Sequence, residues 1–483
     1  MTPRKLFVFC DGTWQDGINN NRPLTNVATL ARCLQRSDPQ IIVYYDNGIG
    51  NVTSAFAQLI DGATGRGISA KIRNAYSFLS NNYNFQERQD QIILVGFSRG
   101  AFAVQCLASF LSDVGLLETK YLYHHLRPLF TLWSHQNMTV AKEKLETELR
   151  KLRELPISVI HQVPIKVCAV WDAVSALGGV ARLLPGRYSF VGKKVPKSVE
   201  HSFQALALNE KRRRFKPCVW ESVQEQDQNQ PETGPRTVSQ CWFLGSHGDI
   251  GGNGDAALGA VTLLWMMEKI HLNAGIEFDE KEIQDHLKHK YLEWDYTVNR
   301  LFRSIKETKK MSSMNHSGEV TNAPWYWGIL GWEPRSKYLM PSSGELGSIA
   351  GEIHFTVRLR MSLGENTSEV LRSWTTSIPQ GSRLNKRVEW QHPRHASMAM
   401  NEHRLVQGKM EYKLASGWNN QPHTNMTTAT AVQEIHKLEP EAENARAGLD
   451  QYSKSLQQYM EFKDHIVAPN LMYPGDRSTG AGL

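Results

Sequence analysis

Short, continuously apolar runs alternate with longer helical patterns along the first half of the chain. Each run is bounded by Gly, Asp or Ser on at least one side and has the length of a β-strand. Runs that are apolar throughout are typical of a parallel sheet covered on both faces. The predicted strands are Lys5–Cys10, Ile41–Tyr45, Gln91–Phe97, Ile165–Trp171 and Val238–Leu244.

The segments between these runs predict helices. Apolar residues recur in Ile68–Tyr83 at intervals of mostly three and four, as on one face of a helix. Ala101–Val114 is apolar nearly all round, which indicates a helix packed against a sheet. Strands that alternate with helices predict an α/β fold, here an α/β-hydrolase-like, mostly parallel sheet with helices on both faces.

The pattern weakens further along the chain and predicts two parts. Residues 1–365 form a catalytic domain that carries a helical and aromatic insertion at about 270–340. Residues 366–483 form a polar C-terminal extension, with a helix near 440–462. The Gly-rich, polar tail from 474 onward is expected to be disordered.

Composition and charge narrow the class of protein. Of 483 residues, 41% are hydrophobic and 21% charged, with a formal net charge of +7, which is ordinary for a globular protein. Nucleic-acid binders usually concentrate their basic residues on one face, so no nucleic-acid partner is expected. The densest basic run, Lys211–Arg214, is expected to be a solvated helix face.

Cysteine use and apolar run lengths bear on location. The six cysteines are scattered without a C-x-x-C pair, which favours a reducing compartment over a disulfide scaffold or a zinc site. The predicted strand at Lys5–Cys10 leaves no room for a signal peptide. No run approaches the roughly 18 apolar residues of a membrane span. A cytoplasmic location is therefore expected.

One pentapeptide carries the main chemical signal. Gly96-Phe97-Ser98-Arg99-Gly100 matches G-x-S-x-G, directly after one predicted strand and directly before a predicted helix. This strand–turn–helix context is the one that a nucleophile elbow requires, because a sharp turn lifts the serine oxygen above the sheet. The pattern predicts that Ser98 is a nucleophile.

A serine hydroxyl needs a base, usually a histidine that a carboxylate holds, in the chain order Ser, Asp or Glu, His for this fold. Asp172 and His247 follow later predicted strands in that order. Asp249, two residues after His247, is a rival acid or an auxiliary site residue; Asp172 is favoured.

Oxyanion donors are expected from two backbone positions. The N–H of Arg99 lies at the start of the predicted helix, and the N–H of Thr13 follows an early strand. Gly12 permits close backbone approach. Asp11 is a possible auxiliary residue, because a carboxylate beside an oxyanion hole must be hydrogen-bonded away or hold a metal.

Several segments occur together in one order: Phe9–Trp14, Gly62–Gly65, Ala75–Leu79, Gly96–Phe102, Val170–Asp172, His201–Phe215 and His247–Gly252. In this the chain resembles an uncharacterised α/β-hydrolase domain family that includes the phospholipase effectors of bacterial type VI secretion. The resemblance implies a triad of Ser98, Asp172 and His247 and esterase or phospholipase activity. The chain departs from the family in having Ala173 where Thr is usual and Gly248 where Ser is frequent.

The leading interpretation is therefore a serine esterase or lipase that acts on a small-molecule or lipid ester. It needs no cofactor or metal and makes transient contact with a membrane surface.

Two alternatives remain open. One is a metal-dependent phosphoesterase that uses Asp11, Asp46, His247 and Asp249 as hard ligands for Mg²⁺ or Mn²⁺. The other is a non-catalytic interaction module, for which the aromatic residues 325–332 are a candidate surface; those residues are alternatively a lid or ordinary packing. The sequence leaves the oligomeric state open.

Overall fold

A computed structural model of the chain describes part of its length. The described residues are 3–12, 24–34, 38–47, 66–87, 89–154, 159–160, 163–174, 187–220, 237–279, 281–283, 285–286, 320, 331–335, 339, 351–354, 356–357, 370–371, 374–377, 389–392 and 395–403.

A single ten-stranded sheet organises these residues, in the order β10-β11-β12-β9-β8-β7-β6-β3-β1-β2. All neighbouring strands from β9 to β2 pair in parallel, and the only antiparallel pairs in this described sheet are β10 with β11 and β11 with β12. The strands are β1 (Lys5–Cys10), β2 (Ile41–Asp46), β3 (Gln91–Phe97), β6 (Ile165–Trp171), β7 (Val199–Ala207), β8 (Thr237–Phe243), β9 (Glu352–His354), β10 (Thr375–Ser377), β11 (Glu389–His392) and β12 (His395–His403). A separate short pair joins β4 (Leu116–Leu117) to β5 (Val159–Ile160).

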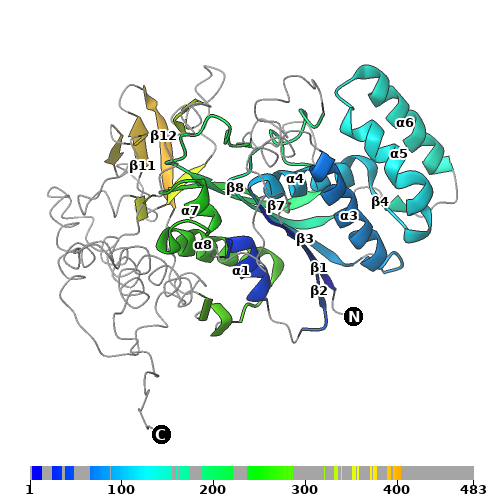
Figure 1. Cartoon of the computed structure of the whole chain (residues 1–483), viewed down its shortest axis with the longest axis horizontal. Helices are drawn as coiled ribbons and strands as arrows, with labels where there is room; N and C mark the ends of the chain where they lie inside the picture. Colours follow the sequence, from blue (N-terminus) through cyan, green and yellow to red (C-terminus); the bar gives the residue numbers. More distant parts are fainter. Residues whose placement is uncertain are drawn as a thin grey trace, which may run out of the picture.

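Helices cover both faces of the sheet (Figure 1). They are α1 (Asn26–Arg32), α3 (Arg66–Asn82), α4 (Ser98–Val114), α5 (Leu122–Ser134), α6 (Thr139–Glu154), α7 (His247–Gly251) and α8 (Ala256–Ala274), with a 3₁₀ turn η1 at Thr119–Tyr121. Figure 1 shows α3 to α6 on one side of the sheet and α1, α7 and α8 on the other.

Alternate residues of the strands supply two separate cores, as the twofold repeat of a strand requires. Phe7 and Phe9 of β1 face the α1 and α8 side, whereas Leu6 and Val8 face the side of α3, α4 and α5. Both sets are fully buried. This two-sided burial explains why β1 is apolar at every position after Lys5, and the predicted α/β fold is confirmed.

Most predicted elements lie where the sequence placed them. β1, β3 and β6 have the predicted bounds, and β2 and β8 differ from the prediction by one residue at their ends. The helix predicted at Ala101 begins three residues earlier, at Ser98, because the turn that follows β3 is itself the first turn of the helix. The sequence missed the central strand β7 and the α5–α6 hairpin.

The later part of the chain is described only in pieces. Strands β10, β11 and β12 lie beyond residue 365 and extend the same sheet, so part of the C-terminal extension pairs with the catalytic domain. The division near residue 365 stays a prediction. Most of the insertion at about 270–340, the helix near 440–462 and the tail lie outside the described residues. None of the described helices combines the length and the apolar character that a membrane span needs.

Candidate active site

The turn between β3 and α4 presents Ser98 in an unusual backbone conformation. Ser98 has φ 58°, a left-handed value that non-glycine residues seldom adopt and that marks stored local strain. Gly100 explains how the turn fits: a Cβ there would lie 2.1 Å from the carbonyl oxygen of Cys10 on β1. The glycine therefore lets α4 pack against β1 without a side chain between them, and this contact fixes where Ser98 stands.

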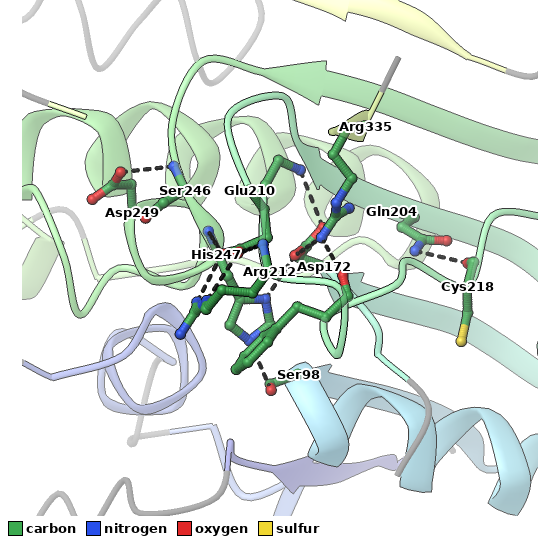
Figure 2. A network of polar contacts seen from close by, with 12 residues as sticks. Ser98, Asp172, Gln204, Glu210, Arg212, Cys218, Ser246, His247, Asp249 and Arg335 are labelled. Atoms are coloured by element: carbon green, nitrogen blue, oxygen red, sulfur yellow. Dashed lines mark hydrogen bonds and ion pairs between the residues drawn. The ribbon is translucent and has the colours of Figure 1, made fainter. Parts of the chain in front are cut away.

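Ser98, His247 and Asp172 form one chain of hydrogen bonds (Figure 2). His247 Nε2 lies 2.8 Å from Ser98 Oγ, and His247 Nδ1 lies 2.6 Å from Asp172 Oδ2. All three side chains are buried. The three residues come from the carboxyl ends of β3, β6 and β8, which is the edge where open α/β sheets place their sites.

The loop after β6 holds the acid close to the nucleophile turn. Asp172 donates its backbone N–H to the Ala205 carbonyl on β7 at 2.7 Å, and it also has a positive φ of 38°. Two residues on, Val174 donates its N–H to the Ser98 carbonyl at 3.3 Å. Backbone bonds thus connect Ser98, Asp172 and β7 independently of the side chains of the Ser98–His247–Asp172 chain.

Two aromatic rings enclose the imidazole of His247. Phe97 stacks on it with ring centroids 4.7 Å apart, and Phe215 meets it edge-on at 4.9 Å. Burial among such groups disfavours the charged imidazolium and lowers the pKa of His247, although Asp172 opposes that shift. A histidine that is neutral at pH 7 can accept a proton from serine.

Asp172 has partners besides His247. Its Oδ1 accepts the Ala207 N–H at 3.1 Å, and Arg335 donates to both carboxylate oxygens at 3.0 Å each. Burial alone would raise the pKa of Asp172, but the Arg335 guanidinium and the hydrogen bond from His247 outweigh it and hold that pKa well below its usual range. The acid is therefore ionised at all ordinary pH values.

Asp249, the rival acid, faces away from the imidazole (Figure 2). Its carboxylate accepts the backbone N–H groups of Ser246 at 2.7 Å and Asp255 at 2.8 Å. With Ser246 it forms the capping box of α7, the short helix on which His247 is the first residue. Asp249 therefore holds the turn that carries His247, and the His247 ring is hydrogen-bonded to Asp172 instead.

The predicted oxyanion loop is described only up to Gly12, and Thr13 lies outside the described residues. A Cβ on Gly12 would lie 2.9 Å from the Phe97 ring and 3.4 Å from Ser98 Cβ, so the glycine brings this backbone against the nucleophile. Its N–H is donated to the Asp11 carboxylate at 2.7 Å. Arg99 is the second residue of α4, and burial lowers the pKa of its guanidinium to about 10, so it remains charged at neutral pH.

Asp11 is hydrogen-bonded away from the nucleophile. Besides the Gly12 N–H, its carboxylate accepts the hydroxyls of Thr25 at 2.7 Å and Tyr45 at 2.6 Å. Burial raises its pKa, and these hydrogen bonds act in the opposite direction. Three donors thus fix the Asp11 carboxylate at the end of β1.

The four ligands of the alternative metal centre do not converge. Asp11 is held as just described, and Asp46 pairs with Lys71. His247 lies in the triad, and Asp249 caps α7. Within the described ranges no group of three or more His, Cys, Asp or Glu side chains is placed to hold a metal ion. The structure therefore gives this alternative no assembled site.

Two charged groups that the sequence did not place at the site, Glu210 and Arg212, lie beside the triad. Glu210, 2% exposed, accepts the backbone N–H of His247 at 3.2 Å and binds Arg212 through both carboxylate oxygens. Arg212 lies over the Phe215 ring at 3.6 Å. The basic run at 211–214 was expected to be a solvated helix face, and this is wrong: the segment is a non-helical turn, because Arg212 folds back to neutralise the buried Glu210.

Arg335 was also missed, since it is distant in sequence from every predicted site residue. Its side chain is 1% exposed and belongs to the segment that follows the aromatic residues. No local motif marks it. A basic residue just after an aromatic run, in a part of the chain that is otherwise polar, was the only available signal.

Comparison with known proteins identifies the family of the chain. A model of the family described as "T6SS, Phospholipase effector Tle1-like, catalytic domain" matches residues 4–269, more than half of the chain and the part that contains Ser98, Asp172 and His247. The family resemblance predicted from the motifs is thereby confirmed.

Individual relatives are more distant. The uncharacterized protein YEL023C of Saccharomyces cerevisiae is 28% identical over 221 residues, which are 42% of this chain and 31% of the yeast protein. An uncharacterized protein from Pseudomonas aeruginosa has a TM-score of 0.33 at 14% identity, over 71% of this chain and 60% of that one. The Tle1 effector bound to the VgrG spike from the type 6 secretion system has a TM-score of 0.26 at 16% identity, over 52% and 51%. The chain thus spans less than two thirds of each relative's length.

Proposed function

Because the chain belongs to the Tle1-like catalytic domain family of T6SS phospholipase effectors, we propose that it is a serine hydrolase that cleaves acyl esters, with phospholipids as its substrate class. One observation carries the proposal: the continuous hydrogen-bond chain from Ser98 through His247 to Asp172, at 2.8 and 2.6 Å. Contacts of this length allow a proton to move from serine to histidine without rearrangement.

In the first half of the reaction, His247 Nε2 accepts the Ser98 proton while Ser98 Oγ attacks the ester carbonyl carbon. Asp172 keeps the Nδ1–H of His247 oriented and stabilises the imidazolium that forms. The tetrahedral intermediate collapses as the alcohol leaves with the proton from His247. In the second half, a water molecule that His247 deprotonates attacks the acyl-serine, and the fatty acid is released.

The developing oxyanion needs preorganised donors. We assign this role to the backbone N–H of Arg99, at the start of α4, and to that of Thr13. The close packing of Gly12 against Ser98 Cβ supports the assignment, because it brings the loop after β1 within reach of a carbonyl bound at Ser98. The Gly12 N–H is already donated to Asp11, so Gly12 contributes by its size and not as a donor.

The first experiment compares wild type with Ser98→Ala on short- and long-chain nitrophenyl esters. We expect the variant to lose at least about 10³-fold in kcat. Ser109→Ala, on the same helix, is the matched control. It should keep full activity, because the Ser109 hydroxyl donates to Asp113 at 3.5 Å, about three helical turns away from Ser98. Equal rates for wild type and Ser98→Ala would refute the proposal.

A second experiment fixes the bond that is cleaved. A fluorophosphonate probe should label wild type at Ser98, as mapped by peptide mass spectrometry, and should not label Ser98→Ala. Phospholipid vesicles should then release free fatty acid rather than phosphorylated head group. Release of head group alone would favour a phosphoesterase over an acyl hydrolase.

A further inference from the structure

Asp172 is bound by a cation that a serine–histidine–aspartate mechanism does not require. The Arg335 Nη1 and Nη2 atoms each donate to one oxygen of Asp172 at 3.0 Å, and Nη2 also donates to the Phe215 carbonyl at 2.8 Å. Arg335 is 1% exposed and Asp172 is fully buried. A planar guanidinium that binds both oxygens fixes the plane of the carboxylate as well as its position.

The segment that carries Arg335 is held in place by its own contacts. Residues 331–335 lie antiparallel to residues 211–213: Arg213 donates its N–H to the Gly331 carbonyl at 3.1 Å, and Glu333 donates to the Lys211 carbonyl at 2.6 Å. The Glu333 carboxylate lies 3.8 Å from Arg213 and 3.7 Å from Lys216. The segment is therefore attached by backbone and by charge, and Arg335 is its inward-facing side chain (Figure 2).

We propose that Arg335 is a positioning residue of the triad: it fixes the Asp172 carboxylate in the plane that His247 needs, and it balances the negative charge of that carboxylate beside the imidazole. This inference rests on the proposed hydrolase function, which assigns the proton transfer to His247.

The electrostatic part follows from the charges around the imidazole. Among the described residues, Asp172 on the β6 loop and Glu210 and Arg212 after β7 act on His247 directly. Arg335 acts through Asp172, which it binds. Arg212 is neutralised by Glu210, as Asp172 is by Arg335. Without Arg335, the unbalanced Asp172 carboxylate would stabilise the imidazolium and make His247 a base that is already protonated at mildly acidic pH.

Two substitutions separate charge from geometry. Arg335→Gln removes the charge and keeps an N–H donor, so the acid limb of the pH profile of kcat/KM should move up by about one pH unit. Arg335→Lys keeps the charge and loses the bidentate fork. Its acid limb should stay near that of wild type while kcat falls about 10-fold or more with KM unchanged, as expected when only the transition state is affected.

Arg4→Met is the matched control. Arg4 also binds both oxygens of an aspartate, Asp90, at 3.1 and 2.6 Å, but at the amino end of β1 and far from the triad edge of the sheet. It should lower the melting temperature without moving the pH profile. A merely structural role for Arg335 predicts the same behaviour for Arg335→Gln.

The outcomes are distinguishable from failure of the proposed function. If Ser98→Ala abolishes hydrolysis and Arg335→Gln has a wild-type pH profile, the inference about Arg335 is wrong and the hydrolase function stands. If Ser98→Ala stays active, the hydrolase function itself fails. Should neither Arg335 variant fold, the ion pair is primarily structural, which would also overturn the inference.

Discussion

Replacing Gly100 by alanine tests whether the close contact between α4 and β1 sets the position of Ser98. The added Cβ would lie 2.1 Å from the Cys10 carbonyl oxygen and 2.5 Å from that of Asp11, both backbone atoms of the sheet edge. Since such contacts are not observed below about 3 Å, the first turn of α4 would have to move away from β1 by about 1 Å. The nucleophile is in this turn and would move with it.

The two energetic effects of Gly100→Ala oppose each other. Helix propensity favours alanine over glycine by about 1 kcal/mol. Overpacking against a fixed backbone costs about 1–3 kcal/mol or more, and here the neighbours cannot rotate away. We therefore expect a net loss of stability of about 1–2 kcal/mol. A misplacement of about 1 Å at the reacting centre should lower kcat/KM by about 10²-fold.

Gly248→Ala is the matched control, because Gly248 directly follows His247 near the start of α7. Its Cβ would lie 3.4 Å from Asn253 Oδ1, an ordinary contact with a side chain. This variant should keep its stability and stay within a few-fold of wild-type activity. The assays are thermal unfolding and hydrolysis of a nitrophenyl ester. A Gly100→Ala enzyme that matches Gly248→Ala in both would refute the reasoning.

Three further predictions concern protons and caps. Burial lowers the pKa of His247, and protonation removes the base, so kcat/KM should fall as the pH decreases through a midpoint below the ordinary histidine value of about 6.5; a midpoint above 7 would contradict this. Asp172→Asn leaves Arg335 as an unpaired buried cation, so urea unfolding should show a stability loss of about 3–5 kcal/mol and kcat should fall about 10⁴-fold. Asp249→Asn should lose about 1 kcal/mol of stability and much less activity. Equal losses in the two variants would contradict the roles assigned to these carboxylates. Asp255→Ala removes the side-chain acceptor that caps α8 and should cost about 1 kcal/mol in thermal unfolding with kcat unchanged, whereas Asp255→Asn should restore the cap.

The strands that carry the reacting residues could be predicted because their local signals are strong. β3 and β6 are buried on both faces and therefore almost entirely apolar, and each ends directly before a residue with a polar side chain, Ser98 or Asp172. The nucleophile turn is also local, since the glycines at 96 and 100 are needed by contacts within the strand–turn–helix unit and with β1. Such features appear in the sequence wherever the fold requires them.

Strand β7 could not be predicted from its own pattern. The segment Val199–Ala207 contains His201, Ser202 and Gln204 among apolar residues, so it reads as neither a continuous apolar run nor a regular alternation. Its polar side chains are tolerated in part because Gln204 donates to the Cys218 carbonyl at 3.0 Å, a contact with a later loop. A strand that carries polar residues at buried positions has no period for a sequence pattern to detect.

Glu210 and Arg335 were missed for a related reason. Each is a buried charge that is stable only because a partner of opposite charge faces it: Arg212 for Glu210, and Asp172 for Arg335. In sequence, a charged residue is read as exposed, since unpaired charges are almost never buried. The ion pair that makes burial possible forms only after the chain has folded. The sequence therefore predicts a surface position for these two residues, although they lie beside the site.

β7 nevertheless determines how the acid and the base meet. It lies between β6 and β8 in the sheet, and strands are spaced about 4.8 Å apart, so the ends of β6 and β8 are separated by about 10 Å. His247, after β8, therefore contacts Asp172, after β6, across the end of β7. That strand and the loop after it provide the contacts: the Ala207 N–H holds Asp172, and the Glu210 carboxylate accepts the N–H of His247. The residues proposed to react are therefore recognisable from local chemistry. The residues that hold Asp172 and His247 2.6 Å apart belong instead to β7 and the loop after it, whose role depends on neighbours in the sheet.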